Sequence, residues 1–218
     1  MDMMYIRRKM MNSNTGGGRL LPDGYIQLPY IIGNYTASNI DTGISGDNDN
    51  LRFQFCVEVN YFTNYASLFG NYVSETSNCW RVIMATSNNV FYASHNKRAN
   101  NSSVITCDSS FIDNALYFDL SSSSISLKMN GTTYTKQSPS SVGTANDTNI
   151  AIGNSSVSNG STSSSKRAKW YYFSIYDNGT LIRNYIPCKR TSDDKAGFYD
   201  IVNDTFNPST GRSDFILP

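Results

Sequence analysis

Carboxylate side chains are the first candidates for chemistry in this sequence, and glutamate is scarce among them. The chain of 218 residues contains two glutamates, Glu58 and Glu75, which lie seventeen positions apart. Retaining hydrolysis of a glycosidic bond needs two carboxyl groups about 5 Å apart. No Glu-x-Asp-x-x-Glu arrangement occurs that could supply such a pair. We therefore expect no hydrolysis of glycosidic bonds and, more broadly, no enzymatic activity.

The histidine at position 95 is the next candidate, because it is the one histidine of the chain. His95 lies in the polar, basic stretch Ser-His-Asn-Lys-Arg, which is typical of an exposed loop. A Ser-His-Asp triad remains open on composition, but no Gly-x-Ser-x-Gly nucleophile elbow accompanies the histidine. A GxxxxGK[ST] phosphate-binding loop is missing as well. We interpret His95 as an ordinary exposed loop histidine.

Aromatic rings and planar polar groups suit sugar recognition, since sugars stack on rings and bond to amides and carboxylates. Trp80, Tyr92 and His95 lie near one expected hairpin and are the candidate carbohydrate-binding residues. Trp80 also alternates with Val82 and Met84, however, a pattern that equally predicts a core position. Trp170 has the same ambiguity.

Oxygen-rich and sulfur-bearing side chains are the candidate metal ligands of the chain. Asp47 and Asp49, in the stretch Asp-Asn-Asp-Asn, could bind calcium, although an Asx-rich turn explains the same residues. The four cysteines (Cys56, Cys79, Cys107 and Cys188) form no CxxC pair and have no metal-ligand spacing. We interpret them as free thiols and predict no metal and no cofactor.

Charge and hydropathy exclude several classes of partner. Charged residues make up 16% of the chain, against about 25% in an average soluble domain, and the formal net charge is +1. No global field therefore favours nucleic acid. No stretch approaches the about 20 apolar residues that span a bilayer. No apolar run or cleavage site typical of a secretory signal follows residues 1–11, which favours synthesis in the cytoplasm.

The sequence pattern predicts that the elements that position these side chains are short antiparallel strands. Leu51, Phe53, Phe55, Val57 and Val59 alternate with Arg52, Gln54, Cys56 and Glu58, which predicts a strand with one buried face. Similar alternation occurs in residues 116–120 and 125–129. Ser121–Ser124 is expected to connect two of these strands tightly, and residues 153–167 to form a polar surface loop.

Two Asn-Gly pairs predict two-residue hairpin loops, because both central positions of a type I′ turn need positive φ. The loop at Asn130-Gly131 would set Met129 opposite Thr132 and Leu127 opposite Tyr134. The loop at Asn178-Gly179 would pair Ile175 with Ile182 and Tyr171 with Ile186. A further hairpin is expected at residues 87–89. These signals, with no helical pattern, predict an all-β, two-sheet antiparallel sandwich over residues 19–218.

Residues 1–18 differ from the rest and are predicted to form a short extended arm. Residues 16–18 are three glycines that would act as a hinge. The arm could anchor the protein to a partner, or it could be a disordered terminus of no consequence. The candidate anchoring residues are Met3, Met4, Tyr5, Ile6, Arg7, Arg8, Lys9, Met10 and Met11.

Three stretches carry a family resemblance. They are the opening Leu-Pro-Asp-Gly-Tyr-Ile-Gln-Leu-Pro-Tyr-Ile at 21–31, Phe-Ser-Ile-Tyr-Asp-Asn-Gly at 173–179, and Ala-Gly-Phe-Tyr-Asp at 196–200. Together they resemble laminin-G-like domains of the concanavalin A-like lectin and glucanase class, of the type found in gut bacteria and their phages. The resemblance covers about residues 20–218 and implies a jelly-roll sandwich. This fold hosts lectins, hydrolases, adhesins and structural modules, so it does not decide the function.

The resemblance and the arm together favour a non-enzymatic structural protein of a bacteriophage virion, such as a capsid-decorating protein or head fibre. We expect it to be a homo-oligomer that attaches through the arm to capsid or other virion proteins, and contact with host-surface glycans is a further role. A cell-surface lectin or adhesin module of a gut bacterium is the alternative, and a glycoside hydrolase is the third. The protein would accordingly be found in the virion or, in the alternative, at the bacterial surface.

Overall fold

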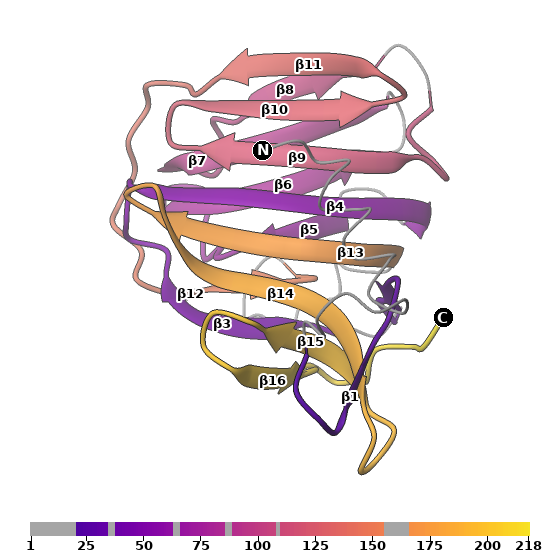
Figure 1. The fold of residues 1–218 in the computed structure, drawn as a ribbon. Coiled ribbons are helices and arrows are strands. Elements are labelled where there is room, and N and C mark those ends of the chain that lie inside the picture. The colour runs from indigo at the N-terminus through magenta and orange to yellow at the C-terminus, as the bar shows by residue number, and fades with distance from the viewer. Residues whose placement is uncertain (1–20, 35–37, 63–65, 86–88, 108–109, 155–165) are drawn as a thin grey trace.

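The computed structural model describes residues 21–34, 38–62, 66–85, 89–107, 110–154 and 166–218. The predicted arm, residues 1–18, lies outside the described residues. In the described part of the chain every regular element is a β-strand, and the strands form two antiparallel sheets packed face to face (Figure 1). The prediction of an all-β, two-sheet jelly-roll sandwich is therefore confirmed.

The sheet nearer the viewer in Figure 1 has ten strands. Its strands in spatial order are β11 (Thr132–Gln137), β10 (Ser124–Met129), β9 (Ala115–Ser121), β4 (Leu51–Phe62), β13 (Lys166–Asp177), β14 (Thr180–Arg190), β15 (Ala196–Asp200) and β16 (Thr205–Pro208). Two short strands join from the side, since β1 (Tyr25–Gln27) pairs with β14 and β2 (Ile31–Ile32) pairs with β13.

The sheet behind it has six strands. In spatial order these are β3 (Ile40–Ser45), β12 (Asn149–Ile152), β5 (Ala66–Gly70), β6 (Asn78–Ala85), β7 (Val90–Arg98) and β8 (Ser103–Thr106). The chain passes repeatedly from one sheet to the other, for example from β3 through β4 to β5. Strands that are neighbours in space are therefore often far apart in the sequence.

The core lies between the sheets and is rich in aromatic rings. The alternation predicted for β4 is confirmed, since Leu51, Phe53, Phe55, Val57 and Val59 are all buried. The Phe55 ring stacks on Phe118 of β9 at 4.7 Å and on Phe173 of β13 at 5.2 Å between ring centroids. Phe69 of β5 meets Phe55 from the other sheet at 5.4 Å. Burial of these rings supplies the main hydrophobic stabilisation of the sandwich.

The Asn130-Gly131 hairpin is confirmed in its register. Met129 pairs with Thr132 and Leu127 with Tyr134, and both loop residues have positive φ, 49° and 82°. The other two predicted connections also join the expected strands. Ala85 of β6 pairs with Val90 of β7, and β9 ends at Ser121 three residues before β10 begins at Ser124.

The register predicted for the Asn178-Gly179 hairpin is wrong beyond its first pairs. Asp177 pairs with Thr180 and Tyr176 with Leu181, but Ile175 then pairs with Arg183 instead of Ile182. A β-bulge inserts one extra residue in β14 at this point, and an inserted residue shifts every later pair by one. Lys166 and Arg167, predicted to belong to the surface loop at 153–167, are part of β13, and residues 155–165 of that predicted loop lie outside the described residues.

Candidate functional site

Trp80 cannot stack on a sugar, because its side chain is completely buried between the sheets. It lies in β6 with Val82 and Met84 in the core cluster, and its ring meets Phe53 edge-on at 5.1 Å between ring centroids. The prediction of Trp80 as a carbohydrate contact is therefore wrong, and the core alternative holds. Trp170 is also buried and belongs to the same core cluster.

His95 is a buried strand residue, so the prediction of an exposed loop histidine is wrong. Its Nδ1 donates to the Ser121 carbonyl at 2.7 Å, and its Nε2 lies 2.8 Å from Ser103 Oγ. Ser103 Oγ is also 2.6 Å from the Gln137 carbonyl, so one hydroxyl proton is shared between two acceptors. Burial lowers the pKa of His95, partly opposed by its bond to Ser121. These contacts join β7 and β8 to the other sheet and leave the ring no carboxylate partner among the described residues.

Tyr92 lies apart from the other two predicted sugar contacts. It is half-buried on the outer face of the six-stranded sheet, where its cross-strand neighbours are Ile83 and Val104. Trp80 and His95 point to the opposite side of the same sheet, into the core. Trp80 and His95 are cross-strand partners, whereas Tyr92 is an odd number of residues from His95 along β7 and therefore lies on the other face.

The Asp47 and Asp49 loop is organised by hydrogen bonds of its own. The Asn48 carboxamide oxygen accepts the Asn50 N–H at 2.9 Å, which is an Asx turn. Asp49 accepts the Asn96 amide at 3.1 Å, and the Asp47 N–H donates to Ser45 Oγ. The part of the chain that the structure describes contains no group of three His, Cys, Asp or Glu side chains placed to hold a metal ion.

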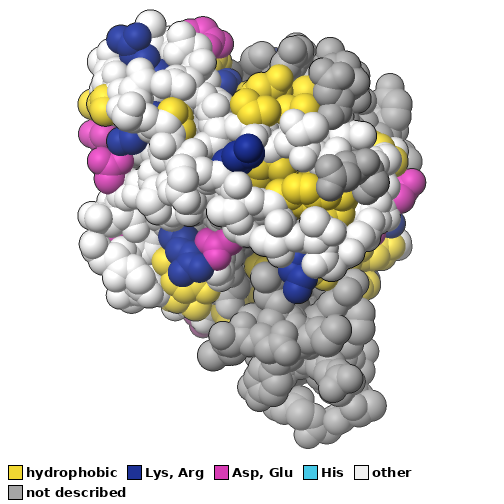
Figure 2. All heavy atoms as spheres, turned by 90° about the horizontal axis from the view of Figure 1, so that it is seen from above, with side chains coloured by type: hydrophobic (Ala, Val, Ile, Leu, Met, Phe, Trp, Pro, Cys, Tyr) yellow, Lys and Arg dark blue, Asp and Glu magenta, His cyan; other side chains and the backbone are white. Residues whose placement is uncertain are grey.

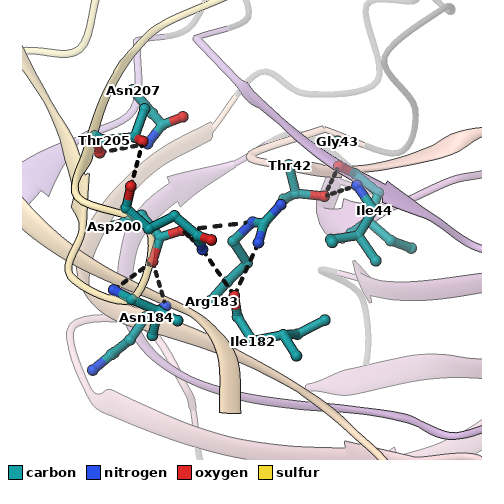
Figure 3. Close-up of polar contacts among 12 residues, drawn as sticks. Thr42, Gly43, Ile44, Ile182, Arg183, Asn184, Asp200, Thr205 and Asn207 are labelled. Atoms are coloured by element: carbon teal, nitrogen blue, oxygen red, sulfur yellow. Dashed lines mark hydrogen bonds and ion pairs between the residues drawn. The ribbon is translucent and has the colours of Figure 1, made fainter. Parts of the chain in front are cut away.

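A polar cluster around Asp200, at the end of β15, connects neighbouring strands by hydrogen bonds (Figure 3). The buried Asp200 carboxylate accepts the backbone N–H groups of Asn184 and Val202 and the Asn203 amide, at 2.7–3.1 Å. The Arg183 Nε lies 3.5 Å from the same carboxylate. Because both carboxylate oxygens have partners and the side chain is sealed from solvent, this cluster holds β14 and β15 together and does not present a binding site.

The outer face of the ten-stranded sheet offers a different arrangement, which we call the open face. Its middle row crosses five strands and consists of Ser126 of β10, Asp119 of β9, Gln54 of β4, Ser174 of β13 and Asn184 of β14. Neighbouring strands in a sheet lie about 4.8 Å apart, so these hydroxyl, carboxylate and amide groups form a continuous polar line.

Tyrosine-bearing rows flank this polar line on both sides. On one side, Lys128, Tyr117, Cys56 and Tyr172 are cross-strand neighbours in that order. On the other side, Arg52 pairs with Tyr176 across β4 and β13. Cys56 itself is buried, and burial raises the pKa of the Tyr172 hydroxyl above its usual range. The tyrosine rings therefore stand on either side of the polar row, partly covered by their neighbours.

Hydrogen bonds tie the middle row to its flanks. The Tyr176 hydroxyl donates to Gln54 Oε1 at 3.2 Å, and Gln54 Nε2 donates to Asp119 at 2.9 Å. Arg52 binds both oxygens of the same carboxylate, at 2.7 and 2.5 Å. A bidentate pair of this kind fixes the geometry of both side chains. The open face is thereby held in one arrangement by its own contacts.

A second charged group lies beside the open face on β4 and β13. Lys169 Nζ and the Tyr171 hydroxyl both donate to the Glu58 carboxylate, at 2.5 and 2.8 Å. Tyr30 closes this group, since its ring meets Tyr171 at 5.7 Å between centroids and Lys169 lies 5.5 Å from its centre. The bond to Glu58 raises the pKa of Lys169. The group forms a border at one end of the open face.

No protein-family model matches the chain, and no curated protein matches it. Three solved structures are similar to it in fold. They are the mouse laminin α1 chain, domains LG4-5 (14% identity, TM-score 0.44, 70% of this chain and 44% of that chain), a native heptameric SAP-like pentraxin from Limulus polyphemus (10%, 0.43, 72% and 72%) and a Bacillus licheniformis β-glucanase (10%, 0.35, 71% and 98%). The chain thus spans less than half of the laminin chain. These similarities concern the fold alone.

Sequence reasoning missed the open face as a site, although it placed some of its residues. The alternation in β4 put Arg52, Gln54 and Glu58 on the solvent side, which the structure confirms for these three side chains. Their partners come from β9 and β13, which are 65 to 122 residues away in the sequence. The sequence signal that could have indicated this site is the position of tyrosines 117, 172 and 176, each of which alternates with buried residues and so lies on the solvent face of its strand.

Proposed function

We propose that this protein is a non-enzymatic structural protein of a bacteriophage virion, a capsid-decorating protein or head fibre, whose sandwich binds glycans. The open face of the ten-stranded sheet carries the glycan-binding part of the proposal. The single supporting observation is its layout: a polar row of Ser, Asp, Gln, Ser and Asn between rows that carry Tyr117, Tyr172 and Tyr176.

The chemistry of this layout matches that of a sugar ring. A pyranose has an apolar C–H face that packs on an aromatic ring and an equatorial rim of hydroxyls that bond to amides and carboxylates. The open face supplies rings on both sides of a line of amide, carboxylate and hydroxyl groups. An extended glycan lying along the line would contact both kinds of group at each residue.

Binding without hydrolysis is supported by the placement of the carboxylates. Asp119 pairs with Gln54, four residues along β4 from Glu58, so the backbones of these two acids are about 13 Å apart along the strand at about 3.3 Å per residue. Retaining hydrolysis needs about 5 Å and inverting hydrolysis about 6.5–9.5 Å. Each carboxylate is also bound to a cation, Arg52 or Lys169.

Glycan binding is tested with the purified full chain on an array of bacterial capsular, cell-wall and neutral plant polysaccharides. We expect Tyr176→Ala to weaken binding about tenfold or more, equal to about 1.4 kcal/mol, because the ring is lost. Tyr176→Phe keeps the ring and should bind within about threefold of the native protein. Val73→Ala, at an exposed residue after β5, is the matched control.

Two outcomes would count against glycan binding by this face: no glycan retained by the native protein, or equal binding by native protein and Tyr176→Ala with both shown to be folded. Release of reducing ends from any bound polysaccharide would instead support the glycoside-hydrolase alternative. A hydrolysis that Glu58→Gln abolishes would identify the acid responsible.

The virion role is supported by the family resemblance and by the Met-rich, basic composition of residues 1–18. An arm of this kind can anchor a protein to a partner while a glycine hinge lets the domain move. Deleting residues 1–18 should leave a folded sandwich that no longer incorporates into virus particles. Incorporation at the native level, or recovery of the native protein on bacterial cells without any particle, would favour a tail of no consequence or the adhesin alternative.

A further inference from the structure

We propose that the open face selects acidic glycans, those carrying carboxylate or sulfate groups, and that Lys128 contacts the acidic group. This inference rests on the proposed glycan-binding function and adds the class of ligand. It comes from how the charges and the hydrogen-bond donors of the open face are oriented, which the overall charge of +1 does not reveal.

In both ion pairs at the open face, the side chain of the cation is more exposed to solvent than the side chain of the anion. The Arg52 side chain is 48% exposed and its partner Asp119 is 32% exposed. Lys169 is 27% exposed and its partner Glu58 is 16% exposed. In each pair the negative charge is thus neutralised and lies deeper, while the positive group lies nearer the solvent. Pairing weakens the fields of both groups, but an approaching anion would meet the more exposed cation of each pair before its carboxylate.

Lys128 adds a positive charge that no acid balances. It is exposed in β10, and it forms no ion pair within the described ranges of the chain. Its cross-strand neighbour is Tyr117, so its ammonium group stands at the end of one tyrosine row. A sugar stacked on Tyr117 would bring a ring substituent within reach of Lys128, since adjacent strands are about 4.8 Å apart.

The neutral amides of the middle row are also oriented toward an acceptor. Gln54 Oε1 accepts the Tyr176 hydroxyl, and Asn184 Oδ1 accepts the Ser174 hydroxyl at 3.0 Å. The carbonyl end of each amide is therefore already used within the protein. The nitrogen ends retain hydrogens, since each NH₂ group has two and Gln54 uses one on Asp119. Carboxylate and sulfate oxygens are the acceptors that such donors bind best.

The positive character is local, which makes it testable with single substitutions. Figure 2 looks down on the edge of the sandwich at the β11 end of Figure 1, and there the Lys and Arg side chains stand apart from one another among neutral polar and hydrophobic surface. A preference for acidic ligands should therefore depend on a few cations, and it should weaken as salt screens them.

The test uses two matched pairs of polymers with the full chain: polygalacturonate against its methyl ester, and dextran sulfate against dextran. Dissociation constants are measured by calorimetry at 20 and 200 mM NaCl. We expect at least one acidic polymer to bind fivefold or more tightly than its neutral counterpart at low salt. The pair that shows the difference identifies the carboxylate or the sulfate as the recognised group.

Lys128→Gln should reduce this preference to twofold or less while leaving the protein folded. Lys136→Gln is the control, because Lys136 is an exposed lysine on the neighbouring strand whose partner Ile125 faces the core. Neutral polymers bound as tightly as acidic ones, a preference unchanged by Lys128→Gln, or no binding to either acidic polymer would each overturn the inference. Neutral binding that Tyr176→Ala abolishes would leave the proposed glycan function standing, so the two failures are distinguishable.

Discussion

Truncation of Phe55 gives the most direct test of the sandwich geometry. The Phe55 side chain is completely buried in β4, with rings from three other strands around it: Phe118, Phe173 and Phe69, at 4.7, 5.2 and 5.4 Å between centroids. These neighbours come from both sheets, so they cannot close the gap that Phe55→Ala leaves. Phenylalanine-to-alanine changes at such sites cost about 3–5 kcal/mol. For a protein of this length, about 2–4 °C per kcal/mol gives a fall in Tm of about 10 °C.

Gln54→Ala is the matched control, one residue along the same strand and on its other face. Gln54 is partly exposed, and its loss removes bonds to Asp119 and Tyr176 that water can replace, so we expect a cost of about 1 kcal/mol or less. Urea unfolding of both variants, followed by tryptophan fluorescence, gives the two free energies. Equal costs for the two variants would refute the assignment of Phe55 to the core face and Gln54 to the solvent face.

Two further predictions concern buried polar groups. Asp200→Ala should lower the free energy of unfolding by about 3 kcal/mol, because it leaves Arg183 and two backbone N–H groups without their acceptor. Asp200→Asn should lower it clearly less. Equal losses for the two variants in urea unfolding would count against a role for this carboxylate. Burial lowers the pKa of His95 in the folded protein. As the pH decreases below about 6.5, the pKa of histidine in the unfolded chain, the unfolded chain binds the proton more readily than the folded protein, so the free energy of unfolding decreases. Thermal melts between pH 7.5 and 5.5 should show this loss in the native protein and a smaller one in His95→Gln; parallel curves would contradict it.

The local pattern of the sequence was enough to predict several strands, among them β4, β9 and β10, and which face of each of these three is buried. In β4, alternation alone assigned Phe53 and Phe55 to the core, because side chains along a strand point to opposite faces and only one face meets the other sheet. The Asn130-Gly131 loop likewise determined its hairpin register, because a two-residue turn with positive φ leaves one pairing. Both are short-range effects within a few residues.

Side chains near the strand ends were predicted less well. His95 has polar and basic neighbours in the sequence, yet it is buried, because the Ser121 carbonyl of the other sheet and Ser103 of β8 satisfy its two ring nitrogens. A buried polar group is stable only where such partners exist, and these partners come from other strands. The β-bulge in β14, because of which Ile175 pairs with Arg183 and not with Ile182, is likewise not indicated by the sequence of the hairpin.

The sequence by itself determined the class of fold, several of the strands and the absence of a Glu-x-Asp-x-x-Glu arrangement. Only the tertiary structure decided where a candidate site lies. Trp80 and Tyr92 are close in the sequence but face opposite sides of one sheet, whereas Gln54, Asp119 and Tyr176 are far apart and hydrogen-bonded to one another. The reason is that a two-sheet sandwich pairs strands by long-range hydrogen bonding, and the order of β9, β4 and β13 in the sheet is set by packing of their buried faces.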